Sequence, residues 1–331
     1  MDNIATLLGK IHLPSWLAFQ QSQSPLGICS IGFDADHLIF TYIHRVHGHN
    51  ELAVCARLPF TESTLVEVLT HLVKKHHLQN AKCSLMLPSN KYQVFSLEEL
   101  PVTTEEFQSA IRWNIKKLIS FPIEDAVVDS FPIPPLKINN PKKMISVVVA
   151  QASYLMPLVD IIESCGLKMQ YINIQEMGFK NITSQLEKDE TGSALIHMQE
   201  QSSTVIITRQ KEFYLSRHLD WGLDFIKQNK EDPTYIDTQL DKLALEVQRT
   251  FDYFQTQWRY PAPTRVLLAP THKVEVAIDD FLSKRLAIET RELDLQAVIP
   301  CKHALSLPMQ SRCLAVIGGA LRREIKNNAK H

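Results

Sequence analysis

The order of strands and helices that the sequence predicts occurs twice along the chain, and this repeat limits the possible folds more than any other feature. In the first half, alternating apolar residues predict strands at 26–33, 37–46 and 51–58, a helix at 63–77 and a strand at 82–87. In the second half they predict strands at 193–198, 204–208 and 213–217, helices near 220–229 and 237–258, a strand at 265–268 and a helix at 274–284. Two such copies predict a duplicated α/β fold with two lobes and a cleft between them.

A further segment interrupts the first copy. Between the strand at 82–87 and one at 169–173, the sequence predicts a strand at 91–98, a helix at 104–119, strands at 126–133 and 144–150, and a helix at 153–165. A helix at 175–186 closes the first half. We therefore expect an amphipathic lead and linker at 1–24, a first lobe at 25–190 with an inserted subdomain at about 89–166, and a second lobe at 191–331. The last helix, about 309–326, can return to the first lobe.

The helix predicted at 104–119 has clear boundaries. Thr103 and Glu106 have the spacing of a capping box, and Pro122 disfavours helical geometry at the residue before it. Helical periodicity gives an apolar stripe of Phe107, Ile111, Ile115, Leu118 and Ile119. Trp113 lies on the polar side, so it either packs against a second element of the same domain or belongs to a partner surface.

The segment that continues from this helix resembles a known family. Residues 112–129 read RWNIKKLISFPIEDAVVD, which is similar to the RW, K, I, P-x-E-D-A-V-x-D pattern of the PilM-like proteins of type IV pilus assembly. Within that group the segment looks most like that of the proteins of the mannose-sensitive haemagglutinin (MSHA) pilus. Leu87-Pro88-Ser89, Tyr92 and Gly318-Gly319-Ala320-Leu321-Arg322 agree in order and spacing, so the resemblance spans roughly residues 25–325. It implies the two-lobed actin-like ATPase fold, a ribonuclease H-like duplication, with the inserted subdomain found in PilM and FtsA.

The resemblance also implies a function in assembly. A PilM-like protein is a cytoplasmic scaffold at the inner face of the inner membrane, peripheral to it through its partner. It binds the cytosolic tail of a PilN-like inner-membrane protein, among other pilus assembly components, in a groove by the inserted subdomain. Carried over to this chain, the partner-binding candidates are Arg112, Trp113, Lys116, Phe121, Pro122 and Ile123. Aromatic and arginine side chains are frequent energetic centres of interfaces.

An actin-like ATPase holds its nucleotide with loops that need a carboxylate for the waters around Mg²⁺ and glycines that let backbone amides reach the phosphates. In the first loop, with the family pattern Gly-x-Asp-x-Gly, Gly27 is followed by Cys29 at the aspartate position and Ile31 at the second glycine position. A register shifted along the chain supplies Asp34, but places Asp36 at the second glycine position. We interpret Asp34 and Asp36 as residues of a polar hairpin turn.

The other two loops depart from the pattern as well. In the second loop His197 replaces the aspartate and Gln199 the glycine, ahead of Ser203 and Thr204. The third loop, where glycines normally face adenosine, contains Ala269-Pro270. The chain has only ten glycines in 331 residues, below the roughly 7% of average proteins. We therefore expect a pseudo-ATPase that is not an enzyme and needs no cofactor.

Two alternatives remain open. One is an ATP-binding or hydrolysing actin-like protein, or a kinase-like phosphotransferase, that uses Mg²⁺ and ATP at Asp34. The other is the cytosolic part of a type II secretion platform, which shares this fold.

Composition excludes several other classes. The formal net charge is −1, which gives no basis for nucleic-acid binding. The apolar runs are shorter than the roughly 18 residues of a membrane span, and the first residues lack the features of a secretory signal, so we expect a cytoplasmic protein. The six cysteines have no Cys-x-x-Cys spacing, and His44, His47 and His49 have no acidic ligand beside them, so we expect no metal site.

Overall fold

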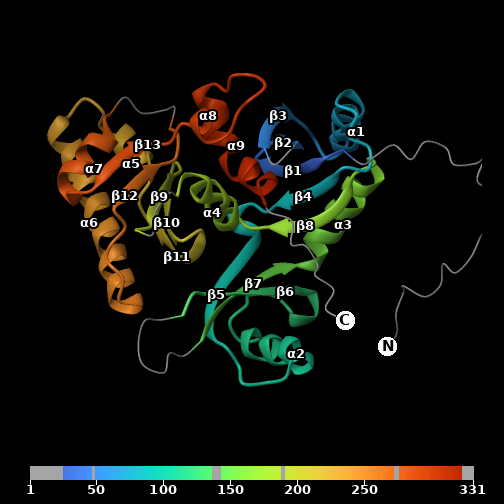
Figure 1. Cartoon of the computed structure of the whole chain (residues 1–331), viewed down its shortest axis with the longest axis horizontal. Helices are drawn as coiled ribbons and strands as arrows, with labels where there is room; N and C mark the ends of the chain where they lie inside the picture. Colours follow the sequence, from blue (N-terminus) through green and yellow to red (C-terminus); the bar gives the residue numbers. More distant parts are fainter. Residues whose placement is uncertain (1–24, 47–48, 136–142, 188–190, 272–275, 323–331) are drawn as a thin grey trace, which may run out of the picture.

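The structure is a computed structural model that describes residues 25–46, 49–135, 143–187, 191–271 and 276–322 (Figure 1). The lead and linker predicted at 1–24, the residue His47 and the end of the predicted last helix beyond residue 322 lie outside these ranges.

Two five-stranded sheets have the same strand order. The first is made of β1 (Gly27–Asp34), β2 (His37–Val46), β3 (His49–Pro59), β4 (Lys82–Met86) and β8 (Lys168–Asn173), in the order β3-β2-β1-β4-β8. The second is made of β9 (Ser193–Met198), β10 (Ser203–Arg209), β11 (Glu212–Leu219), β12 (Arg265–Leu268) and β13 (Glu289–Glu292), in the order β11-β10-β9-β12-β13. In each sheet the first three strands are antiparallel and the last two are parallel to the first. The predicted duplicated α/β fold is confirmed.

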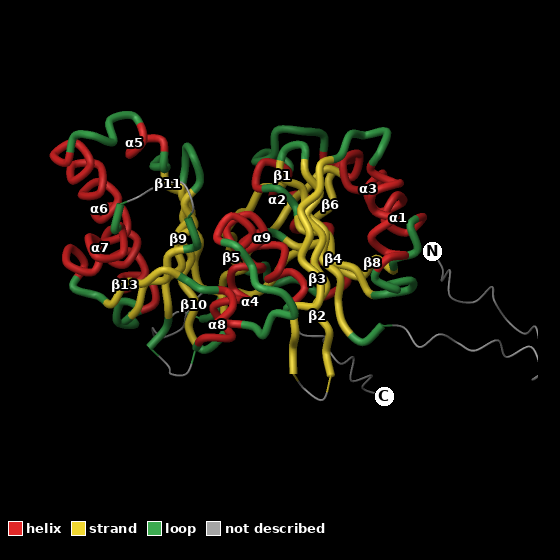
Figure 2. Tube along the Cα trace, turned by 90° about the horizontal axis from the view of Figure 1, so that it is seen from above, coloured by secondary structure: helices red, strands yellow, loops and turns green. Residues whose placement is uncertain are grey.

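Helices cover both sheets in layers. The helices α1 (Leu65–Lys75) and α3 (Ala152–Ser164) share an apolar core with the outer face of the first sheet. The second sheet shares its apolar core with three helices: the short α5 (Asp224–Lys227), the 26-residue α6 (Pro233–Trp258) and α7 (Ile278–Leu286). Between the two sheets lie α4 (Gln175–Leu186) and α9 (Leu307–Ala320), with the short α8 (Leu295–Val298) beside them (Figures 1 and 2). The core around these central helices takes residues from both sheets, so the lobes share one apolar interior.

The central helices touch at glycines. A Cβ added to Gly318 of α9 would lie 2.0 Å from the backbone oxygen of Gly178 in α4. A Cβ on Gly178 would lie 2.5 Å from the backbone oxygen of Ala315. Gly178 and Gly318 therefore allow backbone-to-backbone contact between the helices, whereas a Cβ on Gly319 would lie 2.6 Å from the Ser30 hydroxyl of β1.

The inserted subdomain has a sheet of its own. It contains β5 (Tyr92–Glu98), α2 (Thr104–Ile115), β6 (Ala126–Pro132) and β7 (Met144–Gln151), with single 3-10 turns at Ser89–Lys91 and Ile123–Asp125. The strand order is β5-β7-β6, and α2 covers one face of this sheet. The predicted capping box is confirmed, because the Glu106 amide donates to the Thr103 hydroxyl and the Glu106 carboxylate accepts from the Thr103 amide.

Several predicted boundaries were wrong. The helix α2 ends at Ile115 rather than 119, because the Leu118 amide donates three residues back, to Ile115. Only 224–227 of the helix predicted near 220–229 is helical, because the Leu223 and Asp224 amides donate to Gln199 and Glu200 of the β9–β10 turn instead. The helix α9 ends at Ala320, whose carbonyl accepts a hydrogen bond from Arg45. The elements β13 and α8 were not predicted.

None of the helices in the described part of the chain combines the length and the apolar surface that a membrane span requires.

Candidate functional site

A cleft of about 430 Å³ lies between the two lobes. Its walls come from the end of β1, the residues after β4, the start of α4, the β9–β10 turn and α9. Its polar lining residues are Asp34, Ser89, Asn90, Gln175, His197, Gln199, Glu200, Thr271, Ser311 and Arg312. The cleft therefore brings together residues of the first, second and third candidate nucleotide loops or their immediate neighbours.

Two arginines hold the one carboxylate that the first loop contributes to the cleft wall. The Nε and Nη2 atoms of Arg57 lie 3.1 and 3.0 Å from Asp34 Oδ2. Arg312 Nη1 lies 2.9 Å from Oδ2 and 3.2 Å from Oδ1. Both carboxylate oxygens therefore accept charge-assisted hydrogen bonds, and ordering the waters of a magnesium ion would require breaking these pairs.

The unshifted register of the first loop does not reach the cleft. Gly27, Cys29 and Ile31 lie within β1, and the side chains of Cys29 and Ile31 are fully buried in the core under α1 and α3. Only the shifted register brings a loop residue, Asp34, to the cleft. A turn at Ala35 and Asp36 joins β1 to β2, as predicted for Asp36, but Asp34 is the last residue of β1.

The second and third loops contribute only in part. His197 and Gln199 line the cleft, whereas Ser203 is buried and donates to the Trp221 carbonyl, 2.7 Å away. Thr204 lies within β10, paired with His197. Ala269 and Pro270 are buried behind the cleft wall, and the neighbouring Thr271 lines the cleft instead.

His197 carries no charge near neutral pH. Its ring centroid lies 4.8 Å from that of Phe179, and burial lowers the pKa of the imidazole to about 4. The side chain at the position of a family aspartate is therefore a neutral ring that packs on a buried aromatic residue.

Replacing Asp34 with alanine should destabilise the protein. The substitution leaves two guanidinium groups side by side without their shared carboxylate, so we expect the free energy of unfolding to fall by about 1–2 kcal/mol. Asp36→Ala is the matched control, because Asp36 is exposed and its carboxylate bonds to the neighbouring His37, so this substitution should cost much less stability than Asp34→Ala. Urea unfolding of both variants measures the difference, and equal losses would mean that the arginine pairs contribute nothing.

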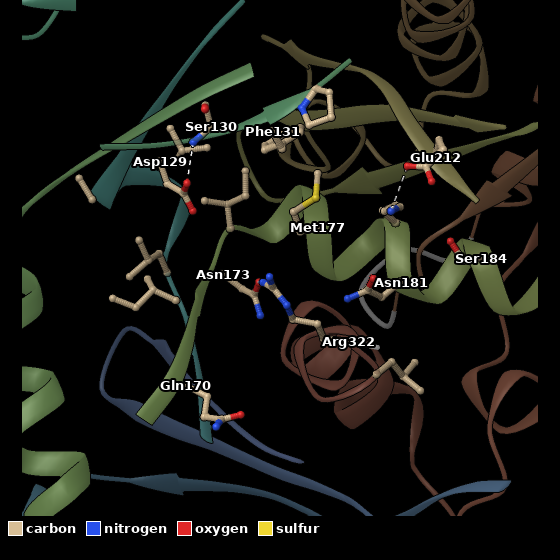
Figure 3. Close-up of a pocket in the computed structure, with 18 of the residues that line it drawn as sticks. Asp129, Ser130, Phe131, Gln170, Asn173, Met177, Asn181, Ser184, Glu212 and Arg322 are labelled. Atoms are coloured by element: carbon tan, nitrogen blue, oxygen red, sulfur yellow. Dashed lines mark hydrogen bonds and ion pairs between the residues drawn. The ribbon is translucent and has the colours of Figure 1, made fainter. Parts of the chain in front are cut away.

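A second, larger pocket of about 850 Å³ lies between the inserted subdomain and the lobes. Figure 3 shows Asp129, Ser130 and Phe131 of β6 on one side of it, and Asn173, Met177, Asn181 and Arg322 on the other. Arg322 donates to the Asn173 side chain at 2.8 Å and lies over the Tyr171 ring at 4.3 Å. The wall is therefore held in place by its own polar contacts.

The pocket combines apolar surface with two sheet edges. The exposed side chains of Val127 on β6 and Ile172 on β8 both line it, with 41% and 40% of their surface accessible. β6 is the last strand of the subdomain sheet and β8 the last strand of the first sheet. Edge strands with apolar side chains can accept an extended peptide segment from another chain.

None of the six predicted partner-binding residues lines this pocket. Along β6, Val127 and the run from Asp129 to Pro132 line the pocket, whereas Ala126 and Val128 pack on the side of the sheet that α2 covers. The predicted residues all belong to that opposite side. Of the pocket residues, Val127 and Asp129 belong to the run 112–129, whereas the walls from β8, α4 and the end of α9 come from distant parts of the chain.

The six residues also differ in what they can do. Arg112 donates to the carbonyls of Ile123 and Ala126, at 2.6 and 2.7 Å, so its guanidinium ties α2 to the chain that enters β6. Phe121 and Ile123 pack against the subdomain core. Lys116 and Pro122 are exposed. Trp113 is 77% exposed, so the alternative of packing against a second element was wrong.

In the described part of the chain, no group of three or more His, Cys, Asp or Glu side chains is arranged to hold a metal ion.

Known structures resemble this one in fold. No protein-family model matches the sequence, and no curated protein matches it. A chain of the PilM-PilN type IV pilus biogenesis complex matches with a TM-score of 0.66 and 15% identity, over 90% of this chain and 98% of that one.

Two further matches have TM-scores below 0.5. A Bacteroides thetaiotaomicron protein with actin-like ATPase fold gives 0.47 at 11% identity, over 87% and 96% of the two chains. The cytoplasmic domain of EpsL, from the type II secretion system of Vibrio cholerae, gives 0.46 at 12% identity, over 87% and 94%. Together with the strand order, the comparison establishes the fold.

Proposed function

We propose that this chain, which has the two-lobed actin-like ATPase fold, is a cytoplasmic scaffold protein of type IV pilus assembly. Its pocket beside the inserted subdomain would bind the cytosolic tail of a PilN-like inner-membrane protein. The observation that carries the proposal is the pocket itself, which has apolar side chains and two open sheet edges, on a fold similar to one solved as part of a PilM-PilN complex.

We further propose that the chain corresponds to MshI, the biogenesis protein of the MSHA pilus. The run 112–129 supports this finer assignment. The chain would then work at the inner face of the inner membrane, held there by its partner. The described helices include no membrane span, so membrane attachment through the partner is consistent with the structure.

We also propose that the cleft is that of a pseudo-ATPase. Three observations support this: the pairing of Asp34 with Arg57 and Arg312, the neutral His197, and the lack of glycine at the third loop. Calorimetry should detect no Mg²⁺-dependent ATP binding, and Asp34→Ala should leave ATP hydrolysis unchanged at background. Micromolar, Mg²⁺-dependent affinity would instead favour the ATPase or kinase-like alternative.

The pocket assignment can be tested with one pair of variants. Val127→Arg places a charge on the apolar side of the pocket, and should weaken binding of a PilN-like cytosolic tail peptide by about tenfold to thirtyfold. Trp113→Ala is the matched control, because it removes a large exposed side chain from the opposite side of the same subdomain. Its affinity should stay within about twofold of the wild type.

Fluorescence anisotropy of the labelled peptide measures both affinities, and thermal unfolding shows whether each variant is folded. If Trp113→Ala loses binding and Val127→Arg does not, the partner binds at α2 rather than in the pocket. The absence of binding by the wild-type chain would overturn the proposed function.

A further inference from the structure

The pocket has walls on two bodies that are joined by only two connections of the chain. One wall comes from β6 and β7 of the inserted subdomain, and the other from β8, α4 and the residues that follow α9. The chain enters the subdomain at Tyr92, the first residue of β5, and leaves it at Gln151, the last residue of β7. The subdomain also touches the second lobe, where Ile133 is buried in the core and the Trp258 indole donates to the Pro134 carbonyl at 3.1 Å. The contacts at the two connections act together with these to set the orientation of the subdomain, and with it the width of the pocket.

At the exit, Asp125 of the subdomain caps α3, the helix that follows β7. Its carboxylate accepts hydrogen bonds from the Ser153 amide at 2.8 Å, the Ser153 hydroxyl at 2.7 Å and the Gln151 side chain at 3.1 Å. The N-cap residue of α3, Gln151, makes no capping bond with its own side chain. A residue 28 positions away thus satisfies the amide that a local cap normally serves.

At the entrance, Tyr92 makes the corresponding contact with α4. Its hydroxyl donates to the Glu176 carboxylate at 2.7 Å and accepts from the Gln175 amide at 3.3 Å. Lys91, the preceding residue, lies 4.9 Å from the ring centroid of Tyr154 in α3. Each connection is therefore fixed by side chains that bridge the subdomain and the lobe.

Arg112 extends the exit contact into the subdomain. Its bonds to the Ile123 and Ala126 carbonyls hold both ends of the short turn that presents Asp125. The contact from α3 thus continues through this turn to α2, and the subdomain is held as one body.

We propose that Asp125 and Tyr92 are positioning residues for partner binding: they hold the inserted subdomain at the angle at which the pocket accepts its peptide. Neither residue lines the pocket, so both act through orientation. The inference rests on the proposed function, which supplies its ligand, the PilN-like tail peptide. If removal of the Asp125 contacts lowers the fraction of molecules in the binding-competent orientation to a tenth, the apparent affinity falls about tenfold.

The experiment compares two aspartate caps. Asp125→Ala should weaken binding of the PilN-like tail peptide about tenfold, and Asp125→Asn, which keeps one carbonyl acceptor for the Ser153 amide, should recover part of the loss. Tyr92→Phe should weaken binding in the same direction. Asp232→Ala is the matched control: Asp232 caps α6 in the second lobe through the Thr234 and Tyr235 amides, away from the pocket. It should leave the peptide affinity unchanged.

A second measurement needs no partner. Spin labels introduced as unnatural amino acids at Lys117, just after α2, and at Tyr253 in α6 report the distance between the subdomain and the second lobe. Asp125→Ala should broaden the distance distribution, and Asp232→Ala should not. If Asp125→Ala leaves the distance distribution between the two labels unchanged, the proposal is overturned. It is also overturned if Asp125→Ala and Asp232→Ala weaken peptide binding equally. A broadened distribution in a chain that does not bind the peptide would support the positioning role and contradict only the proposed function.

Discussion

Gly318→Ala is expected to lower the free energy of unfolding by about 3 kcal/mol, although alanine is the better helix former by about 1 kcal/mol. The reason is the crossing of the two central helices. The new Cβ would lie 2.0 Å from the Gly178 oxygen, 2.5 Å from its carbonyl carbon and 2.8 Å from its Cα. These are backbone atoms, which cannot move aside as the end of a flexible side chain can. The helices would have to separate at the core that joins both sheets.

Gly166→Ala is the matched control for this prediction. Nothing lies within 4 Å of the Cβ position at Gly166, but its φ of +92° is one that alanine rarely adopts. We therefore expect a loss of about 1 kcal/mol from backbone strain alone. Urea unfolding compares the two variants. A gain in stability for Gly318→Ala, as helix propensity alone predicts, would show that the central helices are not in close contact.

Acid should destabilise the protein well before its carboxylates are protonated. The pKa of His197 falls from 6.5 to about 4 in the folded protein, so at pH values between these two the unfolded chain binds more protons than the folded one. Stability therefore decreases as the pH falls from 6.5 to 4. The shift corresponds to a loss of about 3 kcal/mol once the pH has passed below about 4.

The variant His197→Phe isolates this contribution. It keeps an aromatic ring beside Phe179 and removes the titrating group, so its stability should change less between pH 7 and 4 than that of the wild type. Urea unfolding at several pH values gives the two curves. A constant difference between them would mean that His197 titrates at its ordinary pKa in the folded protein.

The fold was largely predictable because its strands alternate and its helices carry apolar stripes. The strand β13 shows the limit: it reads ETRE, and only Thr290 is buried. Its pairing with β12 comes from backbone hydrogen bonds that leave no apolar pattern. The helix near 220–229 was wrong for a related reason, since the β9–β10 turn takes the amides that helix formation would use.

The candidate site was predictable only in outline. The resemblance pointed to a groove by the inserted subdomain, and the six residues carried over to it do not line the pocket found there. Trp113 is the kind of side chain that often anchors an interface. Its position in the sequence, however, does not show which side of the subdomain sheet α2 covers. The pairing of Asp34 with Arg312, 278 residues apart, depends on where α9 packs, so no local pattern contains it.

The position of α9 has a consequence for how the chain folds during synthesis. This helix, at 307–320, packs against β1, β2 and β4, which are among the first elements to leave the ribosome. Until α9 emerges, the inner face of the first sheet lacks the helix that packs on it, and the long sequence separation between the partners slows its burial. Nascent chains should therefore expose that apolar face to chaperones until α9 has left the ribosome.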